Sequence, residues 1–226
     1  MIPFFSLTDI LLLVPALLLG LYAQSRVKST FEKMSKVRAS SGYSGADVAR
    51  RMLQQNGIHD VEVEEVEGRL SDHYDPIKKK LRLSGKVYHS NSLAALGVAA
   101  HETGHAIQHQ VGYRALMLRQ AIFPIARFGS SLLMPLLIGG IFFSIPVLVD
   151  IGIILYAGSV LFTLITLPVE FNASKRALAQ LNSGGYLVGN EVRGAKKVLD
   201  AAALTYVAAA AVAVLNLIRL LLLREE

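Results

Sequence analysis

The longest apolar stretch of the chain is FGSSLLMPLLIGGIFFSIPVLVDIGIILYAGSVLFTLITLPV, residues 128–169, and Asp150 is its only charged residue. A helix that spans a membrane needs about 20 mostly apolar residues. This stretch is twice that length, so it predicts two spans joined by a tight turn near Asp150. Residues 4–23 and 201–223 are each long and apolar enough for one further span. The sequence thus predicts a mostly α-helical protein with four membrane spans.

The composition agrees with a membrane protein and excludes several other classes. Hydrophobic residues make up 53% of the 226 residues, and the sequence has no cysteine. Disulfides, thiolate metal ligands and a cysteine nucleophile are therefore excluded. The formal net charge is +6, but the basic residues lie beside apolar segments, and the sequence has no tryptophan to stack on bases. We predict contact with a lipid bilayer and no binding of nucleic acid; the sequence predicts no oligomeric state.

The distribution of lysine and arginine predicts the topology. Of the 23 such residues, residues 24–127 hold 16 and residues 170–203 hold 5. Because cytoplasmic loops of membrane proteins are rich in lysine and arginine, both segments are expected in the cytoplasm and both termini outside. No lysine or arginine precedes Arg26, so the first span is expected to be a retained anchor rather than a cleaved signal peptide. The protein is predicted to be a multi-pass protein of the cell membrane.

The prediction divides the chain into five parts. They are an anchor at 1–23, a first cytoplasmic part at 24–127, two spans at 128–169, a second cytoplasmic segment at 170–200, and a last span with the C-terminus at 201–226. The first cytoplasmic part is expected to hold a soluble helix at residues 44–57, and a small hairpin or sheet formed by VEVEEV (61–66) and KKLRLS (79–84). A further helix is expected from about Leu93 to His109.

This last predicted helix carries the segment AAHETGHAIQHQ (99–110), which contains the HExxH motif. His101 and His105 are four residues apart, lie on one face of a helix and can bind one Zn²⁺ together. Glu102 lies about 100° further round the helix, where its carboxylate can act as general base on a metal-bound water. This division of roles predicts a zinc-dependent peptidase.

A catalytic zinc takes three protein ligands, so one more is expected from elsewhere in the chain. Glu170 ends the long apolar stretch and opens the second cytoplasmic segment, on the same predicted side as the histidines, and is the expected third ligand. In the alternative, Glu170 is a charge at headgroup level that pairs with Lys175 or Arg176. His109 is expected to be solvated or near the site, because one metal cannot reach three successive turns of a straight helix.

Two other sources of the third ligand are disfavoured. Gln108 and Val111 stand where the metzincin pattern has glycine and histidine. Asp150 would complete a site of the site-2 intramembrane type, but the predicted topology places it on the opposite side of the bilayer. Its expected role is that of a turn residue.

The segments HETGHAIQH (101–109) and EFNASKRAL (170–178), together with the four-span layout, resemble the YugP-like bacterial membrane zinc metallopeptidases over nearly the whole chain. More distantly, the sequence is similar to the HtpX heat-shock proteases and the CAAX prenyl proteases. The resemblance implies a gluzincin-like domain with the same three ligands and the same base. Where the distant relatives have aspartate four residues after the glutamate ligand, this chain has Ser174, so Ser174 or Asn172 is expected to make a weaker hydrogen bond there.

The expected activity is cleavage of unfolded or membrane-tethered polypeptides near the inner leaflet. The KKLRLS strand is expected to offer an edge that pairs with an extended substrate. Oxyanion stabilisation is expected from a residue that can donate a hydrogen bond, and the candidates are Tyr206, Arg193, Tyr186 and His89. Two alternatives stay open: an intramembrane protease of the site-2 type, and a non-catalytic membrane scaffold that keeps zinc for structure.

Overall fold

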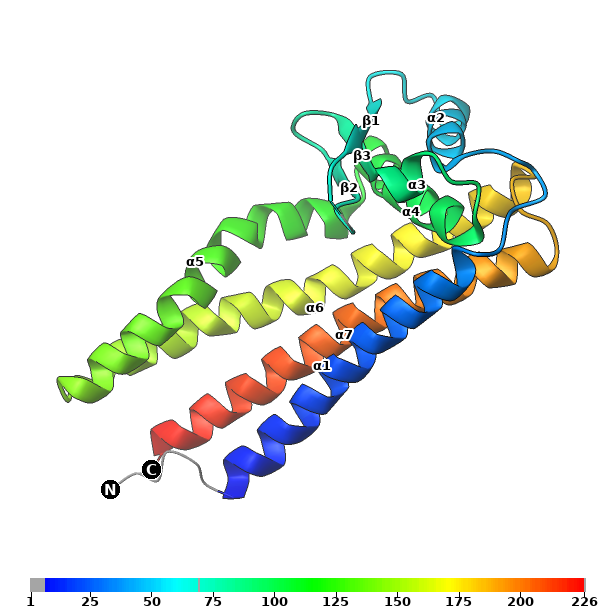
Figure 1. The fold of residues 1–226 in the computed structure, drawn as a ribbon. Helices are drawn as coiled ribbons and strands as arrows, with labels where there is room; N and C mark the ends of the chain where they lie inside the picture. Colours follow the sequence, from blue (N-terminus) through cyan, green and yellow to red (C-terminus); the bar gives the residue numbers. More distant parts are fainter. Residues whose placement is uncertain (1–6, 69, 226) are drawn as a thin grey trace. The chain divides into compact units, whose positions relative to one another are not determined.

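The computed structural model describes residues 7–68 and 70–225 of the chain (Figure 1). Within these residues it contains seven α-helices, α1 to α7, and three strands, β1 to β3. They form two compact units. The apolar unit comprises the chain up to Gln24, residues 117–168 and the chain from Leu204 on. The polar unit comprises residues 25–116 and 169–203.

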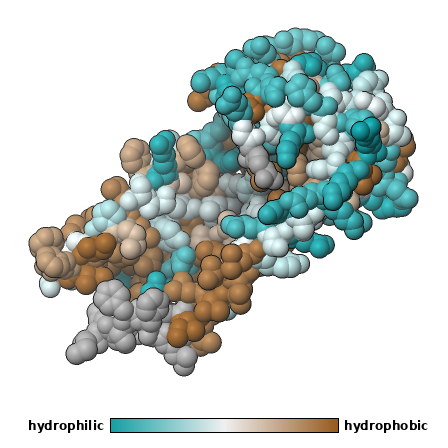
Figure 2. All heavy atoms as spheres, in the orientation of Figure 1, coloured by the Kyte–Doolittle hydropathy of each residue, from teal (hydrophilic) through white to brown (hydrophobic). Residues whose placement is uncertain are grey.

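Four helices are long and apolar enough to cross a membrane. They are α1 (Leu7–Met34), α5 (Arg114–Phe142), α6 (Pro146–Ser183) and α7 (Asn190–Glu225). Between 11% and 22% of their most apolar windows is buried inside the protein, and hydrophobic side chains gather on their surface (Figure 2). An apolar surface of this extent requires lipid rather than water around it. The predicted four spans are confirmed.

The turn between the second and third spans lies at residues 143–145, a few residues before the predicted place near Asp150. Ser144 takes a left-handed backbone conformation with φ of 54°. Pro146 begins α6, a position that its fixed φ and missing N–H suit. Asp150 lies inside α6, and its Oδ1 accepts a hydrogen bond from Arg224 Nε at 2.5 Å. The charge within the apolar stretch therefore marks an ion pair, not the turn.

The polar unit is built around α4 (Leu93–Gln110), with α2 (Gly45–Gln55), the short α3 (Gly85–Tyr88) and parts of α1, α6 and α7. Both longer helices begin at a serine cap, as their sequences favour. The Ser44 side chain accepts from the N–H of Asp47, and the Asp47 side chain accepts from the N–H of Ser44. Ser92 Oγ accepts from the N–H of Ala95 at 3.2 Å. The caps fix where α2 and α4 start, in agreement with the predicted helices.

A small three-stranded sheet is present, as predicted. It consists of β1 (Glu62–Val66), β2 (His73–Asp75) and β3 (Lys80–Ser84), in the order β1-β3-β2, with β1 parallel and β2 antiparallel to β3. The prediction that KKLRLS offers a free edge is wrong, because β3 is the central strand. Leu81 and Leu83 are fully buried, and a strand with such an apolar face is best placed where neighbours cover it.

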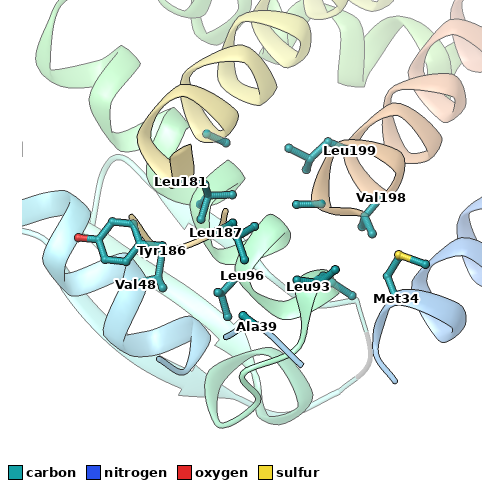
Figure 3. Close-up of a cluster of buried hydrophobic side chains, with 14 of the residues drawn as sticks. Met34, Ala39, Val48, Leu93, Leu96, Leu181, Tyr186, Leu187, Val198 and Leu199 are labelled. Atoms are coloured by element: carbon teal, nitrogen blue, oxygen red, sulfur yellow. The ribbon is translucent and has the colours of Figure 1, made fainter. Parts of the chain in front are cut away.

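Two clusters of buried apolar side chains enclose α4. One, shown in Figure 3, joins Leu96 to residues of α2, α6 and α7, including Leu181 and Val198. The other joins Ala99 to the sheet through Leu81. Full burial of a leucine contributes roughly 1.5–3 kcal/mol, and cores packed on both sides allow a helix little movement. The helix that carries the HETGH segment is thus held rigidly by its apolar half.

Candidate metal centre

The two histidine rings of the HETGH segment pack edge to face in the C-terminal half of α4. The ring centroids of His101 and His105 are 4.8 Å apart, with an interplanar angle of 86°. Each side chain is 12% exposed. Residues four apart lie on one face of a helix, so this pairing follows directly from the local sequence. Both imidazoles are thereby available to a single ligand or ion.

Glu170 completes this group from α6. Its Oε2 lies 3.1 Å from Nε2 of His101 and 3.5 Å from Nε2 of His105, and its side chain is 3% exposed. The ligand atoms of the three residues all lie within 4.8 Å of one another, close enough to hold a metal ion. The structure therefore brings together the three residues that the sequence singles out as ligands.

A glycine allows the close approach of α4 and α6 at this point. A Cβ on Gly104 would lie 2.7 Å from the carbonyl oxygen of Ala173, which no real Cβ contact tolerates. Ala173 is itself fully buried. The glycine between the two histidines thus lets the backbones meet and brings Glu170 within reach of both rings.

The second ring nitrogen of each histidine has its own partner. Nδ1 of His101 lies 3.1 Å from Oγ of Ser174, which takes the expected place of the aspartate. Nδ1 of His105 lies 3.0 Å from Oε1 of Gln108. Asn172, the other residue considered for this role, contacts Gln108 instead. With Nδ1 held in both rings, the two Nε2 atoms are the ones that face Glu170.

Glu102, beside this group on α4, also bonds to the sheet. Its Oε2 accepts a hydrogen bond from the N–H of Tyr74 in β2 at 3.1 Å. The Tyr74 hydroxyl lies 2.9 Å from Nδ1 of His109, so His109 lies near the site, as one of its two expected roles requires. Tyr74 and Gln108 are not among the site residues that the sequence predicts. Gln108 stands three residues after His105, a spacing that places it beside that ring, and this signal was available.

Burial governs the protonation of these groups. It raises the pKa of the Glu102 carboxyl above its ordinary value, although the neighbouring imidazoles oppose the shift. For His105, burial alone lowers the pKa, but hydrogen bonding to Glu170 and the charges of Glu102 and Glu170 outweigh it, so its pKa is raised. Burial raises the pKa of Tyr74 to about 12, which keeps its hydroxyl protonated near neutral pH.

The four residues predicted as candidates to stabilise the oxyanion lie in different environments. Tyr186 is buried and packs edge-on against Tyr43, with ring centroids 5.8 Å apart. His89 is exposed and its Nε2 lies 2.9 Å from Oε2 of Glu65. Arg193 and Tyr206 lie on α7. The contacts of Tyr186 and His89 are those of packing and surface residues.

Two imidazole nitrogens and a carboxylate oxygen are a donor set that Zn²⁺ takes. A helical membrane protein that gathers this set next to a further, half-buried glutamate belongs to the class of membrane metallopeptidases. The family described as "Putative neutral zinc metallopeptidase" matches residues 9–225, and the chain belongs to this family. It is 52% identical over 214 residues to the "Putative membrane protease YugP" of Bacillus subtilis, covering 95% of each chain. No solved structure matches the chain significantly.

Proposed function

We propose that the protein is a zinc-dependent endopeptidase of the cell membrane that cleaves membrane-proximal or unfolded polypeptides on the cytoplasmic side. One observation carries this proposal: the carboxylate of Glu170 lies 3.1 and 3.5 Å from the two facing imidazole nitrogens. Glu102, on the same helix as the imidazoles, makes its hydrogen bond with the sheet instead. These different contacts support the roles of ligand for Glu170 and of base for Glu102.

His101, His105 and Glu170 would hold the zinc, in the manner of a gluzincin, with a later helix supplying the glutamate. When bound, the metal polarises the substrate carbonyl and lowers the pKa of a water. Ser174 and Gln108 hold the rings through Nδ1, so that Nε2 of each is directed toward Glu170. The geometry of the site is therefore set by side chains before any substrate arrives.

Glu102 would move the proton. Its carboxylate accepts a proton from the water that attacks the carbonyl carbon and passes it to the amine nitrogen that leaves. Its pKa, raised by burial, makes it a stronger base than a solvent-exposed carboxylate. The N–H of Tyr74 bonds to one carboxylate oxygen and leaves the other to accept the proton.

The substrate would bind along β2. This strand is an edge of the sheet, and its Tyr74 N–H reaches Glu102, so the side of β2 that pairs with no other strand lies next to the base. An extended peptide can add to such an edge through backbone hydrogen bonds. β2 replaces β3 as the proposed docking strand for that reason.

The two alternatives remain distinguishable. In the intramembrane alternative Asp150 would be a ligand, but its Oδ1 bonds to Arg224 at 2.5 Å, and Glu170 is the carboxylate beside the histidines. In the scaffold alternative the metal is structural and Glu102 is dispensable. A substitution of Glu102 therefore tests the scaffold alternative.

Glu102→Gln is expected to keep fold and zinc yet lose peptidase activity, because an amide cannot accept the proton. Loss of a general base lowers the rate by about 10²–10⁴-fold. Purified wild type and variant would be compared for cleavage of an unstructured casein-like substrate and for zinc by elemental analysis. Glu65→Gln, at an exposed glutamate that bonds His89, is the matched control. Equal cleavage by Glu102→Gln at equal zinc would replace this proposal with the scaffold.

A further inference from the structure

Gln108 is a fully buried polar side chain on α4, and every one of its hydrogen-bonding groups has a partner. Its Oε1 lies 3.0 Å from Nδ1 of His105. Its Nε2 donates to the carbonyl of Val169 at 2.8 Å and to Oδ1 of Asn172 at 3.0 Å. A buried amide with a complete set of partners is held in one orientation.

The partners decide which end of the Gln108 amide faces the histidine. The Val169 carbonyl can only accept, so the group beside it must be the NH₂ of Gln108. The amide oxygen then faces His105, and an amide oxygen can only accept. Nδ1 of His105 must therefore carry a proton, so in the neutral ring the lone pair lies on Nε2, the atom that faces Glu170.

Arg176 fixes the other end of the chain of hydrogen bonds. Its Nε–H donates to Oδ1 of Asn172 at 2.8 Å, and a guanidinium cannot accept. The oxygen of Asn172 is thereby turned toward Arg176 and Gln108 together. Asn172 and Arg176 are four residues apart on α6 and share one face of it. The orientation of the His105 ring thus depends, through Asn172 and Gln108, on Arg176.

The two histidines differ in how their proton is held. The Ser174 hydroxyl beside His101 can either donate or accept, so it leaves the proton position of that ring open. The Gln108 oxygen beside His105 can only accept, so it fixes the proton of that ring on Nδ1. An imidazole with its proton on Nε2 could not bind a metal through that atom. The contact with Gln108 therefore excludes the tautomer of His105 that could not bind metal through Nε2.

We propose that Arg176, Asn172 and Gln108 are positioning residues that together fix the tautomer of His105 for metal binding. This rests on the proposed function, in which His105 is a ligand. Side chains that orient a ligand histidine typically change metal affinity by about 10- to 100-fold when they are removed. The proposal therefore predicts a measurable change in metal affinity at residues that contact no metal.

The test measures metal binding to the full chain purified in detergent. Gln108→Met keeps the approximate volume of the side chain but removes the acceptor, and Arg176→Met removes the donor to Asn172. Thr103→Val is the control on α4, since Thr103 is fully buried and its hydroxyl bonds only its own helix at the Ala99 carbonyl. Lys175→Met is the control for loss of a cation on α6. Arg176→Lys keeps a donor and serves as rescue.

Zinc affinity would be measured by chelator competition, and the visible spectrum would be recorded with Co²⁺ alone as the probe. We expect about 10- to 100-fold weaker zinc binding for Gln108→Met, a smaller loss for Arg176→Met, a changed Co²⁺ spectrum in both, and wild-type behaviour in Thr103→Val, Lys175→Met and Arg176→Lys. Thermal unfolding of the metal-free variants separates these effects from loss of fold.

Wild-type zinc affinity and Co²⁺ spectrum in a folded Gln108→Met would overturn the proposal while leaving the proposed function intact. If Gln108→Met does not fold, Arg176→Met decides: weakened binding supports the proposal, and unchanged binding with an unchanged spectrum refutes it. The proposed function fails by a different result, namely zinc binding that is insensitive to His105→Ala.

Discussion

At the scale of single residues, two glutamates lie beside the same pair of imidazoles, and their neighbours give them different chemistry. Glu170 is nearly fully buried, with one oxygen near both Nε2 atoms. Glu102 bonds to one backbone N–H and keeps a free oxygen. A carboxylate between two imidazole nitrogens is suited to bind a cation, and one with a free oxygen is suited to take a proton.

Glu170→Gln is expected to lower zinc content well below one per chain, because the amide is a poor ligand and two histidines alone are too few for a tight site. Asp150→Asn, which affects only the ion pair with Arg224, should leave zinc unchanged. Elemental analysis of both purified variants checks this. Zinc that depended on Asp150 and not on Glu170 would support the intramembrane alternative instead.

The sequence allowed part of this site to be predicted. His101 and His105 followed from local helix geometry, and Glu170 from the predicted topology. The spacing of Gln108 from His105 places it beside that ring, but the orientation of its amide could not be predicted, because the partners that set it, Val169 and Asn172, are more than sixty residues away. Tyr74 could not be placed either, since its role comes from a backbone N–H, whose direction depends on strand pairing.

At the scale of elements, the crossing of α4 and α6 positions the candidate ligands. The two helices touch at Gly104 and Ala173, with space for a hydrogen atom but not for a methyl group. Helices that approach this closely need a small residue at the contact. The glycine inside HETGH is therefore required by packing, independently of the chemistry of its neighbours.

Gly104→Ala is expected to destabilise the protein by about 1–3 kcal/mol, the usual cost of overpacking, and to weaken zinc binding by moving Glu170 away. Gly97→Ala, on the same helix, would bring its Cβ to 3.6 Å from Ala195, an ordinary contact. It should be neutral or slightly stabilising, because alanine favours helix. Thermal unfolding and zinc content of both variants provide the comparison; equal effects would contradict this account of the crossing.

The elements were predictable to the extent that their signals are local. Capping residues marked the starts of α2 and α4, and hydrophobicity marked the spans. Helix ends were not predictable in this way. The helices α5, α6 and α7 each run through a predicted boundary between a membrane span and a cytoplasmic segment, at 127, 169 and 200, because a helix continues wherever its backbone bonds are satisfied, whatever its polarity. The strand order depends on long-range pairing and was wrong for β3.

At the scale of the whole molecule, the polar unit has apolar clusters that do not include the candidate ligands. Removal of metal by a chelator is therefore expected to abolish peptidase activity while helical content persists, and added zinc should restore activity. Circular dichroism and cleavage assays on one preparation check both. Loss of helix on chelation would show that the metal is needed for folding.

The charge distribution predicts that the HETGH segment faces the cytoplasm, since residues 24–127 hold 16 of the 23 lysines and arginines. A reporter fused after residue 90 should show cytoplasmic activity, and one fused in the turn at residues 143–145 should show external activity. The opposite pattern would refute the predicted orientation and the proposed cytoplasmic substrates with it.

The placement of the proposed ligands on α4 and α6 also sets when the enzyme can become active during its own synthesis. The ribosome completes both histidines before it begins α5, and Glu170 emerges only after the third membrane helix has been largely made. Until then the nascent chain offers two of the three proposed ligands, too few for a tight zinc site. A protease that is inserted while unable to cut cannot damage the insertion machinery that holds it.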